Sequence, residues 1–198
     1  VGGINYLEDL INFVLAKTIS EGLSANFDRA NQVIELYRKT IKTKSERIDW
    51  HEFVLLVETG GAIKAKGLFN NGIRTKVEQS TLSPSDLLVC VRYCFGDFNA
   101  ENAELGSNII DSILKDSKPD IYDRLRAKFY TSKFIPNKDK NFKTADNAQN
   151  MIIVRNTYDE LLEELNSIDG ADKNHYKGIS LLKEVLNDYI GFLADYVW

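Results

Sequence analysis

The chain has 198 residues, with 25 Lys+Arg against 29 Asp+Glu and a formal net charge of −4. Hydrophobic residues make up 43%, which excludes a wholly disordered chain because enough apolar surface is present to offset chain entropy. The mildly acidic total excludes a histone-like polycation. This length fits a single domain over 1–198, and the start at Val1 rather than Met indicates a processed product or a piece of a larger polypeptide.

Helical periodicity dominates the chain. Apolar residues recur every three or four positions over 4–19, 27–41, 50–57, 84–95, 100–115, 121–129, 144–168 and 178–197. Asp49 is expected to cap the third helix, and Ser-Pro-Asp combinations at 83–86 and 117–120 are typical of helix starts. Residues 131–143 are rich in Lys and Asn and predict a loop, and Met151–Val154 is also compatible with a short strand.

Residues 62–79 have a different pattern. Apolar and basic residues alternate on both sides of Asn71-Gly72, and Asn-Gly between alternating runs is a strong signal for a β-hairpin. The predicted fold is therefore mainly α: a single-domain bundle of seven to eight helices with one β-hairpin near 62–79.

Neither the histidines nor the cysteines indicate a metal site. Cys90 and Cys94 lie four residues apart on a predicted helix, but a closed zinc site needs four ligands and no second pair is present. Two cysteines favour buried thiols and a reducing, cytoplasmic location. No nucleotide-binding or hydrolase motif occurs in the sequence. We therefore expect no cofactor, no metal and no enzymatic activity.

One short motif leaves a catalytic alternative open. Arg155-Asn156 resembles part of the motif of HEPN-class helical ribonucleases, in which four to six residues separate an arginine from a histidine. No histidine follows Arg155 at the needed distance, where Asp159 and Glu160 stand instead, and Arg47 and His51 have only three residues between them, one too few. The resemblance implies a ribonuclease with an atypical active site, whereas the neighbouring acids favour His51 as an ordinary residue of a helix's first turn.

Charge is distributed unevenly along the chain. Segments 38–76 and 118–143 each carry a net +5, whereas 156–198 carries −6. Basic segments with interleaved aromatics such as Tyr130, Phe134 and Phe142 are typical of surfaces that follow a phosphate backbone and stack bases. The predicted contacts to nucleic acid are Lys64, Lys66, Arg74, Lys76, Arg124, Arg126, Lys128 and Lys133.

The sequence therefore predicts a non-enzymatic helical binding and assembly module within a larger complex. RNA or DNA is the predicted ligand, and a protein partner or a homo-oligomer is expected as well. As an alternative, the acidic C-terminal region meets the basic segment of a neighbouring copy, which makes the chain purely an oligomerisation subunit. No apolar run approaches the roughly 18 residues that a membrane span needs, and no basic leader precedes the first helix, so neither a membrane location nor secretion is expected.

Overall fold

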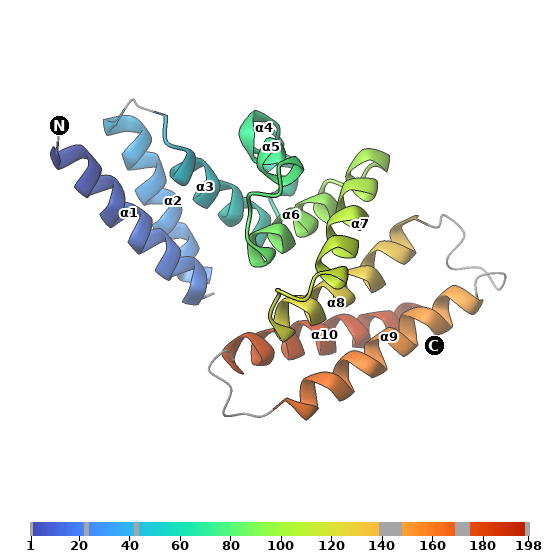
Figure 1. Ribbon diagram of the computed structural model, residues 1–198. Coiled ribbons are helices and arrows are strands. Elements are labelled where there is room, and N and C mark those ends of the chain that lie inside the picture. Colours follow the sequence, from blue (N-terminus) through green and yellow to red (C-terminus); the bar gives the residue numbers. More distant parts are fainter. Residues whose placement is uncertain (1, 22–23, 42–43, 139–147, 169–174, 197–198) are drawn as a thin grey trace. The chain divides into compact units, whose positions relative to one another are not determined.

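The computed structural model describes residues 2–21, 24–41, 44–138, 148–168 and 175–196 (Figure 1). It confirms the mainly α class, because these residues form helices joined by short turns and contain no strand. In chain order the elements are α1 (Gly2–Glu21), α2 (Ser24–Thr40), α3 (Glu46–Glu58), α4 (Ala62–Leu68), η1 (Phe69–Ile73), α5 (Arg74–Glu78), α6 (Pro84–Gly96), α7 (Ala100–Lys115), α8 (Ile121–Lys138), α9 (Ala148–Ser167) and α10 (His175–Tyr196).

Contacts between residues group these helices into two compact units. Unit 1 is Val1–Leu82 and unit 2 is Ser83–Trp198. The single domain expected over 1–198 stays a prediction. None of the helices in the described ranges is both long enough and apolar enough to cross a membrane.

In unit 1, α1, α2 and α3 pack around a small apolar core. Leu15 from α1, Ile34 and Tyr37 from α2, and Ile48 and Leu55 from α3 are at most 3% exposed. Burying such side chains is worth roughly 1.5–3 kcal/mol each, so these contacts are what joins the three helices. On the other side of α3, the ring of Phe53 stacks on that of Phe69 at 5.9 Å between centroids, which brings in the segment after α3.

That segment corrects the hairpin prediction. Residues 62–78 form the helices α4 and α5, joined through η1 with a non-helical kink at Gly72, rather than two strands around Asn71-Gly72. The side chains that are buried are Ala62, Ala65, Phe69, Ile73 and Val77, whose spacings of three and four residues match a helix. The alternating pattern groups Ile63 with Ala65 and Phe69, but Ile63 is 73% exposed. These extra helices also mean that the predicted number of seven to eight is not confirmed.

Two predicted helix starts move in the structure. Ser45, not Asp49, caps α3, where its hydroxyl accepts the Ile48 N–H at 3.4 Å. Asp120, not Ser117, serves the first turn of α8, where its carboxylate accepts the Asp123 N–H at 2.8 Å. In both cases the capping residue lies three positions before the residue whose backbone N–H it accepts. This is the spacing that N-cap geometry requires.

In unit 2, the predicted start of α6 is confirmed. Ser83 accepts the Asp86 N–H at 3.2 Å, and Pro84 occupies the first helical position. The loop predicted over 131–143 is wrong for its first part, because α8 continues to Lys138. The rest of that segment lies outside the described residues. Phe134 explains the extension: it is 4% exposed and packs on Phe95 and Phe98, so its burial holds another turn of helix. Met151–Val154 is helical and lies in α9.

Two glycines let the helices of unit 2 approach closely. A Cβ on Gly106 of α7 would stand 2.6 Å from the Phe134 ring and 3.2 Å from Cys94. A Cβ on Gly178 of α10 would stand 2.6 Å from the Tyr122 ring. Helices α9 and α10 lie side by side in Figure 1, and α8 packs against both of them. Together with the close contacts at the two glycines, this packing makes α8 the central helix of the unit.

Candidate functional site

The basic residues predicted on α8 turn toward acidic residues of the same chain. Three of the four predicted contacts on this helix form ion pairs with carboxylates of α9 and α10. The pairs are Arg126–Glu184 at 2.7 Å, Lys128–Glu160 at 2.7 Å, Lys128–Glu164 at 2.8 Å and Lys133–Asp188 at 2.6 Å. The +5 segment and the −6 region that the sequence separates are thus brought together inside unit 2.

Lys133 has the most enclosed of these environments. Its ammonium donates to Asp188 and lies 5.4 Å and 5.0 Å from the ring centroids of Phe95 and Phe129. Asp188 also accepts a hydrogen bond from Tyr158 at 2.6 Å. A cation held by two aromatic faces and a shared carboxylate is a structural element that joins α8, α9 and α10.

Arg126 and Lys128 hold their charge although they are partly covered. Burial by itself lowers the pKa of Lys128, but hydrogen bonds to Glu160 and Glu164 outweigh burial and leave its pKa raised. Burial likewise opposes the charge of Arg126, and the neighbouring Tyr130 and Glu184 reverse that effect and raise its pKa. Both side chains therefore remain cations whose charge is already matched by carboxylates of the chain.

The aromatic residues interleaved with these cations are not on the surface. Tyr130 and Phe134 are 3% and 4% exposed and belong to the core of unit 2. The prediction that Tyr130 and Phe134 stack on bases is wrong, because stacking needs an accessible ring face and both rings are buried. Phe142 lies outside the described residues.

The predicted contacts in unit 1 lie on α4 and α5, and two of them also form ion pairs. Arg74 contacts Glu78 at 3.0 Å within α5, and Lys76 contacts Glu46 of α3 at 2.9 Å. Lys64 is exposed, as is Lys66 two residues later. Arg74 and Lys76 are 33% and 39% exposed, against 19–29% for the paired cations of α8.

Arg124 is the fourth predicted contact on α8. It is exposed, unlike Arg126 and Lys128 on the same helix. Among the described residues no ion pair of Arg124 or of Lys64 is found. Of the eight predicted contacts, these two are the cations most open to an outside ligand.

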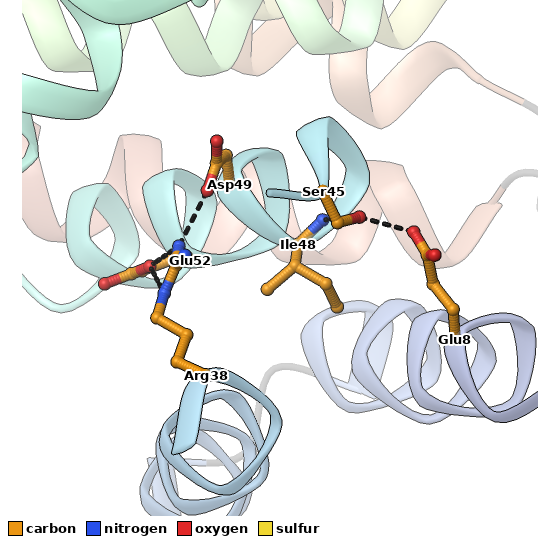
Figure 2. A network of polar contacts seen from close by, with 6 residues as sticks. All are labelled: Glu8, Arg38, Ser45, Ile48, Asp49 and Glu52. Atoms are coloured by element: carbon orange, nitrogen blue, oxygen red, sulfur yellow. Dashed lines mark hydrogen bonds and ion pairs between the residues drawn. The ribbon is translucent and has the colours of Figure 1, made fainter. Parts of the chain in front are cut away.

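The acids near His51 in the sequence, Asp49 and Glu52, take part in contacts between helices (Figure 2). Arg38 of α2 donates from Nη2 to Asp49 at 2.7 Å and from Nε to Glu52 at 2.9 Å, both on α3. The hydroxyl of Ser45 donates to Glu8 of α1 while it accepts from Ile48. Figure 2 shows each carboxylate turned toward a residue of another helix, so these acids position α1, α2 and α3 rather than surround a substrate.

The ribonuclease alternative gains no geometric support. Arg155 lies on α9 and is 58% exposed, with its Nε 3.8 Å from Asp159 one turn later. Asp159 in turn accepts a hydrogen bond from Tyr189 at 2.8 Å. His51 belongs to α3 of unit 1.

The cysteines are buried free thiols, as predicted. Cys90 and Cys94 lie on α6 and are 0% exposed. Burial, reinforced by Cys94 and Asp86, raises the pKa of Cys90 far above its ordinary value, so the thiol stays protonated and unreactive at neutral pH. Within the described ranges, no group of three or more His, Cys, Asp or Glu residues could hold a metal ion.

The structure reveals an apolar surface that sequence reasoning missed. On α1, the exposed fractions are 74% for Tyr6, 48% for Leu10, 67% for Phe13 and 41% for Val14. Leu15 on the same helix is 0% exposed, so α1 is apolar on two sides. Tyr6, Leu10 and Phe13 form a second i, i+4, i+7 series in the sequence, whereas Val14 belongs to the stripe that predicted the helix. We call Tyr6, Leu10, Phe13 and Val14 the α1 outer face.

Comparisons with known proteins found no matching family model, no matching curated protein and no matching solved structure.

Proposed function

We propose that this chain is a non-enzymatic helical module that binds other protein subunits in an assembly. The observation that carries the proposal is the α1 outer face. A helix that is apolar on two sides is normally covered on both, and among the described side chains of α1 Leu15 is buried whereas Tyr6, Leu10 and Phe13 are exposed.

The polar residues support the same proposal. The carboxylates and cations that the sequence singled out hold helices together, as in the contacts of Arg38 and of Lys133. Catalysis by such groups needs an accessible base or nucleophile aimed at a substrate. A scaffold whose charges join helices and whose apolar residues lie on its surface suits binding better. Its cytoplasmic location stays a prediction from cysteine usage.

The test is sedimentation velocity of the full chain over a range of concentrations, at about 0.1 M and about 1 M salt. Contacts through apolar faces should give larger species as concentration rises, and high salt should leave them unchanged or strengthen them. Assembly through basic and acidic patches should instead weaken in high salt. A monomer under every condition contradicts assembly through copies of this chain.

A second candidate is nucleic-acid binding, and the exposure of Lys64 and Arg124 favours it. Lys64→Glu and Arg124→Glu should each weaken binding of a labelled mixed-sequence RNA or DNA oligonucleotide, and binding by the unmodified chain should fall steeply with salt. The matched control is Lys115→Glu, a charge reversal at an exposed lysine outside the predicted basic segments. Salt-independent binding, or an equal loss for the control, counts against specific phosphate contacts.

A further inference from the structure

The middle of α1 buries a polar side chain between exposed apolar ones. Asn12 is 4% exposed, whereas Leu10 and Phe13 on the same helix are 48% and 67% exposed. Neither the Nδ2 nor the Oδ1 atom of Asn12 has a hydrogen-bond partner among the described residues. Buried amides nearly always have partners, because leaving one without them costs free energy. The burial of Asn12 therefore weakens the contact in which it takes part.

That contact is the one that attaches α1 to the other helices of its core. Glu8, one turn before Asn12, accepts a hydrogen bond from Ser45 of α3 (Figure 2). Leu15, about one turn after Asn12, packs in the apolar core together with side chains of α2 and α3. Residues three or four positions apart share one face of a helix, so Asn12 faces the same way as Glu8 and Leu15. The unpartnered amide thus lies in the middle of the attached face of α1.

The other described contacts of α1 offset this cost only in part. Among the side chains described on α1, Leu15 is the only apolar one that is buried, and Ile11 is half-buried against the same core. The ion pair between Asp9 and Arg47 of α3 is exposed, and exposed pairs add little. Burying a leucine and burying an unpartnered amide change the free energy by amounts of the same order and of opposite sign.

Helices α2 and α3 are joined to each other without α1. Arg38 of α2 contacts both Asp49 and Glu52 of α3, as Figure 2 shows. The core adds apolar side chains from the same two helices, Ile34 from α2 and Ile48 from α3. These contacts remain when α1 is removed, so the loss of α1 need not unfold the rest of unit 1.

We propose that α1 is a releasable cover of the α2–α3 pair and that Asn12 sets the low free energy of its release. In the released state water hydrates the Asn12 amide, and the core side chains that α1 covers become accessible. This is local opening, in which one element separates at a lower free energy than the whole unit. The proposal goes beyond the assembly function, because release occurs within one copy of the chain and needs no partner.

Hydrogen–deuterium exchange of the full chain, measured by mass spectrometry of its peptides, tests the release. The amides of α1 should exchange at least about 10-fold faster than those of α3. Asn12→Leu removes the unpartnered amide and keeps the number of heavy side-chain atoms, so it should slow exchange in α1 by about 10-fold. Asn12→Ala, which adds no volume to the core, should also slow it. Fraying of a chain end, which also speeds exchange, does not depend on this amide.

Phe13→Leu is the matched control for helix propensity. Phe and Asn have similar propensities and Leu has a higher one, so this substitution repeats the propensity gain of Asn12→Leu on the exposed side of α1. It should change the exchange of α1 by less than about 3-fold. A slowing as large as that of Asn12→Leu would assign the effect to propensity and would overturn the role of Asn12.

Arg38→Met tests whether α1 separates alone. This change weakens the contact between α2 and α3, so it should speed exchange in α3 by about 3-fold or more and leave α1 unchanged. Equal acceleration of α1 and α3 would overturn the release, because α1 would then exchange only when the whole of unit 1 unfolds. Equal wild-type rates for the two helices would overturn it as well. A rate in α1 that neither Asn12→Leu nor Asn12→Ala slows would show that the amide is hydrogen-bonded in solution and does not set the release.

Discussion

The two units of the chain use charge in different ways. Unit 1 contains 11 Lys+Arg and 10 Asp+Glu, and its pair between Arg47 and Asp9 leaves the two side chains 63% and 65% exposed. Unit 2 contains 14 Lys+Arg and 19 Asp+Glu, and its pair between Lys133 and Asp188 leaves them only 19% and 30% exposed. Unit 1 also has a partly covered pair between Arg38 and Asp49, at 39% and 17% exposure, but unit 2 gathers several such pairs around one helix, α8.

The difference shows that the net charge of a sequence segment does not give the charge of the surface that this segment forms. Segment 118–143 carries +5, yet Arg126, Lys128 and Lys133 direct their charges onto carboxylates of α9 and α10. The acidic C-terminal helices supply that compensation within the chain, where a neighbouring copy or a nucleic acid had been the predicted partner. The charges of these three α8 cations are therefore used in contacts that stabilise unit 2.

The largest effect is expected from Asp188→Ala. Asp188 accepts from both Lys133 and Tyr158, so its loss leaves a half-buried ammonium and a buried hydroxyl without their acceptor. We expect the free energy of unfolding to fall by about 2–3 kcal/mol, measured by urea denaturation followed by circular dichroism.

Asp195→Ala is the control for that change. It removes an exposed carboxylate from the same helix and should alter stability by less than about 0.5 kcal/mol. If the two variants lose the same amount of stability, the ion pairs of unit 2 are no more important than surface charge, and the comparison between the units fails.

Close packing in unit 2 gives the next prediction. Gly106→Ala should cost about 1–2 kcal/mol, because its Cβ overlaps Phe134 and meets Cys94, and neither neighbour lies at a surface that could yield. Gly191→Ala, where a Cβ meets nothing within 4 Å, should instead stabilise the chain by about 0.5–1 kcal/mol through helix propensity. Thermal unfolding of the two variants should therefore shift in opposite directions.

Most helices could be predicted because local signals act over a few residues. Ser83-Pro84 starts α6 as expected, since a cap and the residue after it need no distant partner. The β-hairpin predicted from Asn71-Gly72 is wrong because this dipeptide expresses only a local preference for a turn. Burial of Phe69 and Ile73 against neighbouring helices overrides that preference. Tertiary packing also carries α8 past residue 131, where polar composition alone predicts a loop.

The candidate site was less predictable than the fold. Lys133 and Asp188 are 55 residues apart in sequence, and Arg126 and Glu184 are 58 apart, so no local spacing reveals these pairs. The α1 outer face, by contrast, is a local series that could have been found. It was overlooked because one apolar stripe is enough to predict a helix, and a second stripe acquires meaning only when the first is seen to be buried.

Two neighbouring aspartates of unit 2 predict opposite dependence on pH. Burial raises the pKa of Asp123, and nearby Asp120 adds to the effect. The folded state then binds this proton more tightly than the unfolded state, so stability falls as pH rises through the raised pKa. Asp123→Asn should be more stable than the wild type at pH 7, and the difference should vanish below about pH 4.

Asp120 is the internal control for that sign. Burial opposes its charge, but Lys177 at 2.6 Å and the Asp123 N–H lower its pKa below the ordinary value. Its contribution is present above the ordinary carboxyl pKa and is lost as pH falls through the lowered value. Asp120→Asn should therefore be less stable at pH 7, with a difference that shrinks in acid. Urea titrations between about pH 3 and pH 7 measure both variants, and shifts of the same sign would contradict the assignment.

The smallest effect sharpens the comparison most directly. A double-mutant cycle on Arg47 and Asp9 should give a coupling energy below about 0.5 kcal/mol, because an exposed pair in water gains little and is screened by salt. The same cycle on Arg126 and Glu184, which are 23% and 28% exposed, should give a coupling several times larger that persists in high salt. The two N–O distances are nearly equal, at 2.6 Å and 2.7 Å, so the comparison isolates burial as the variable. Equal couplings would show that covering these charges adds nothing to the strength of the ion pair.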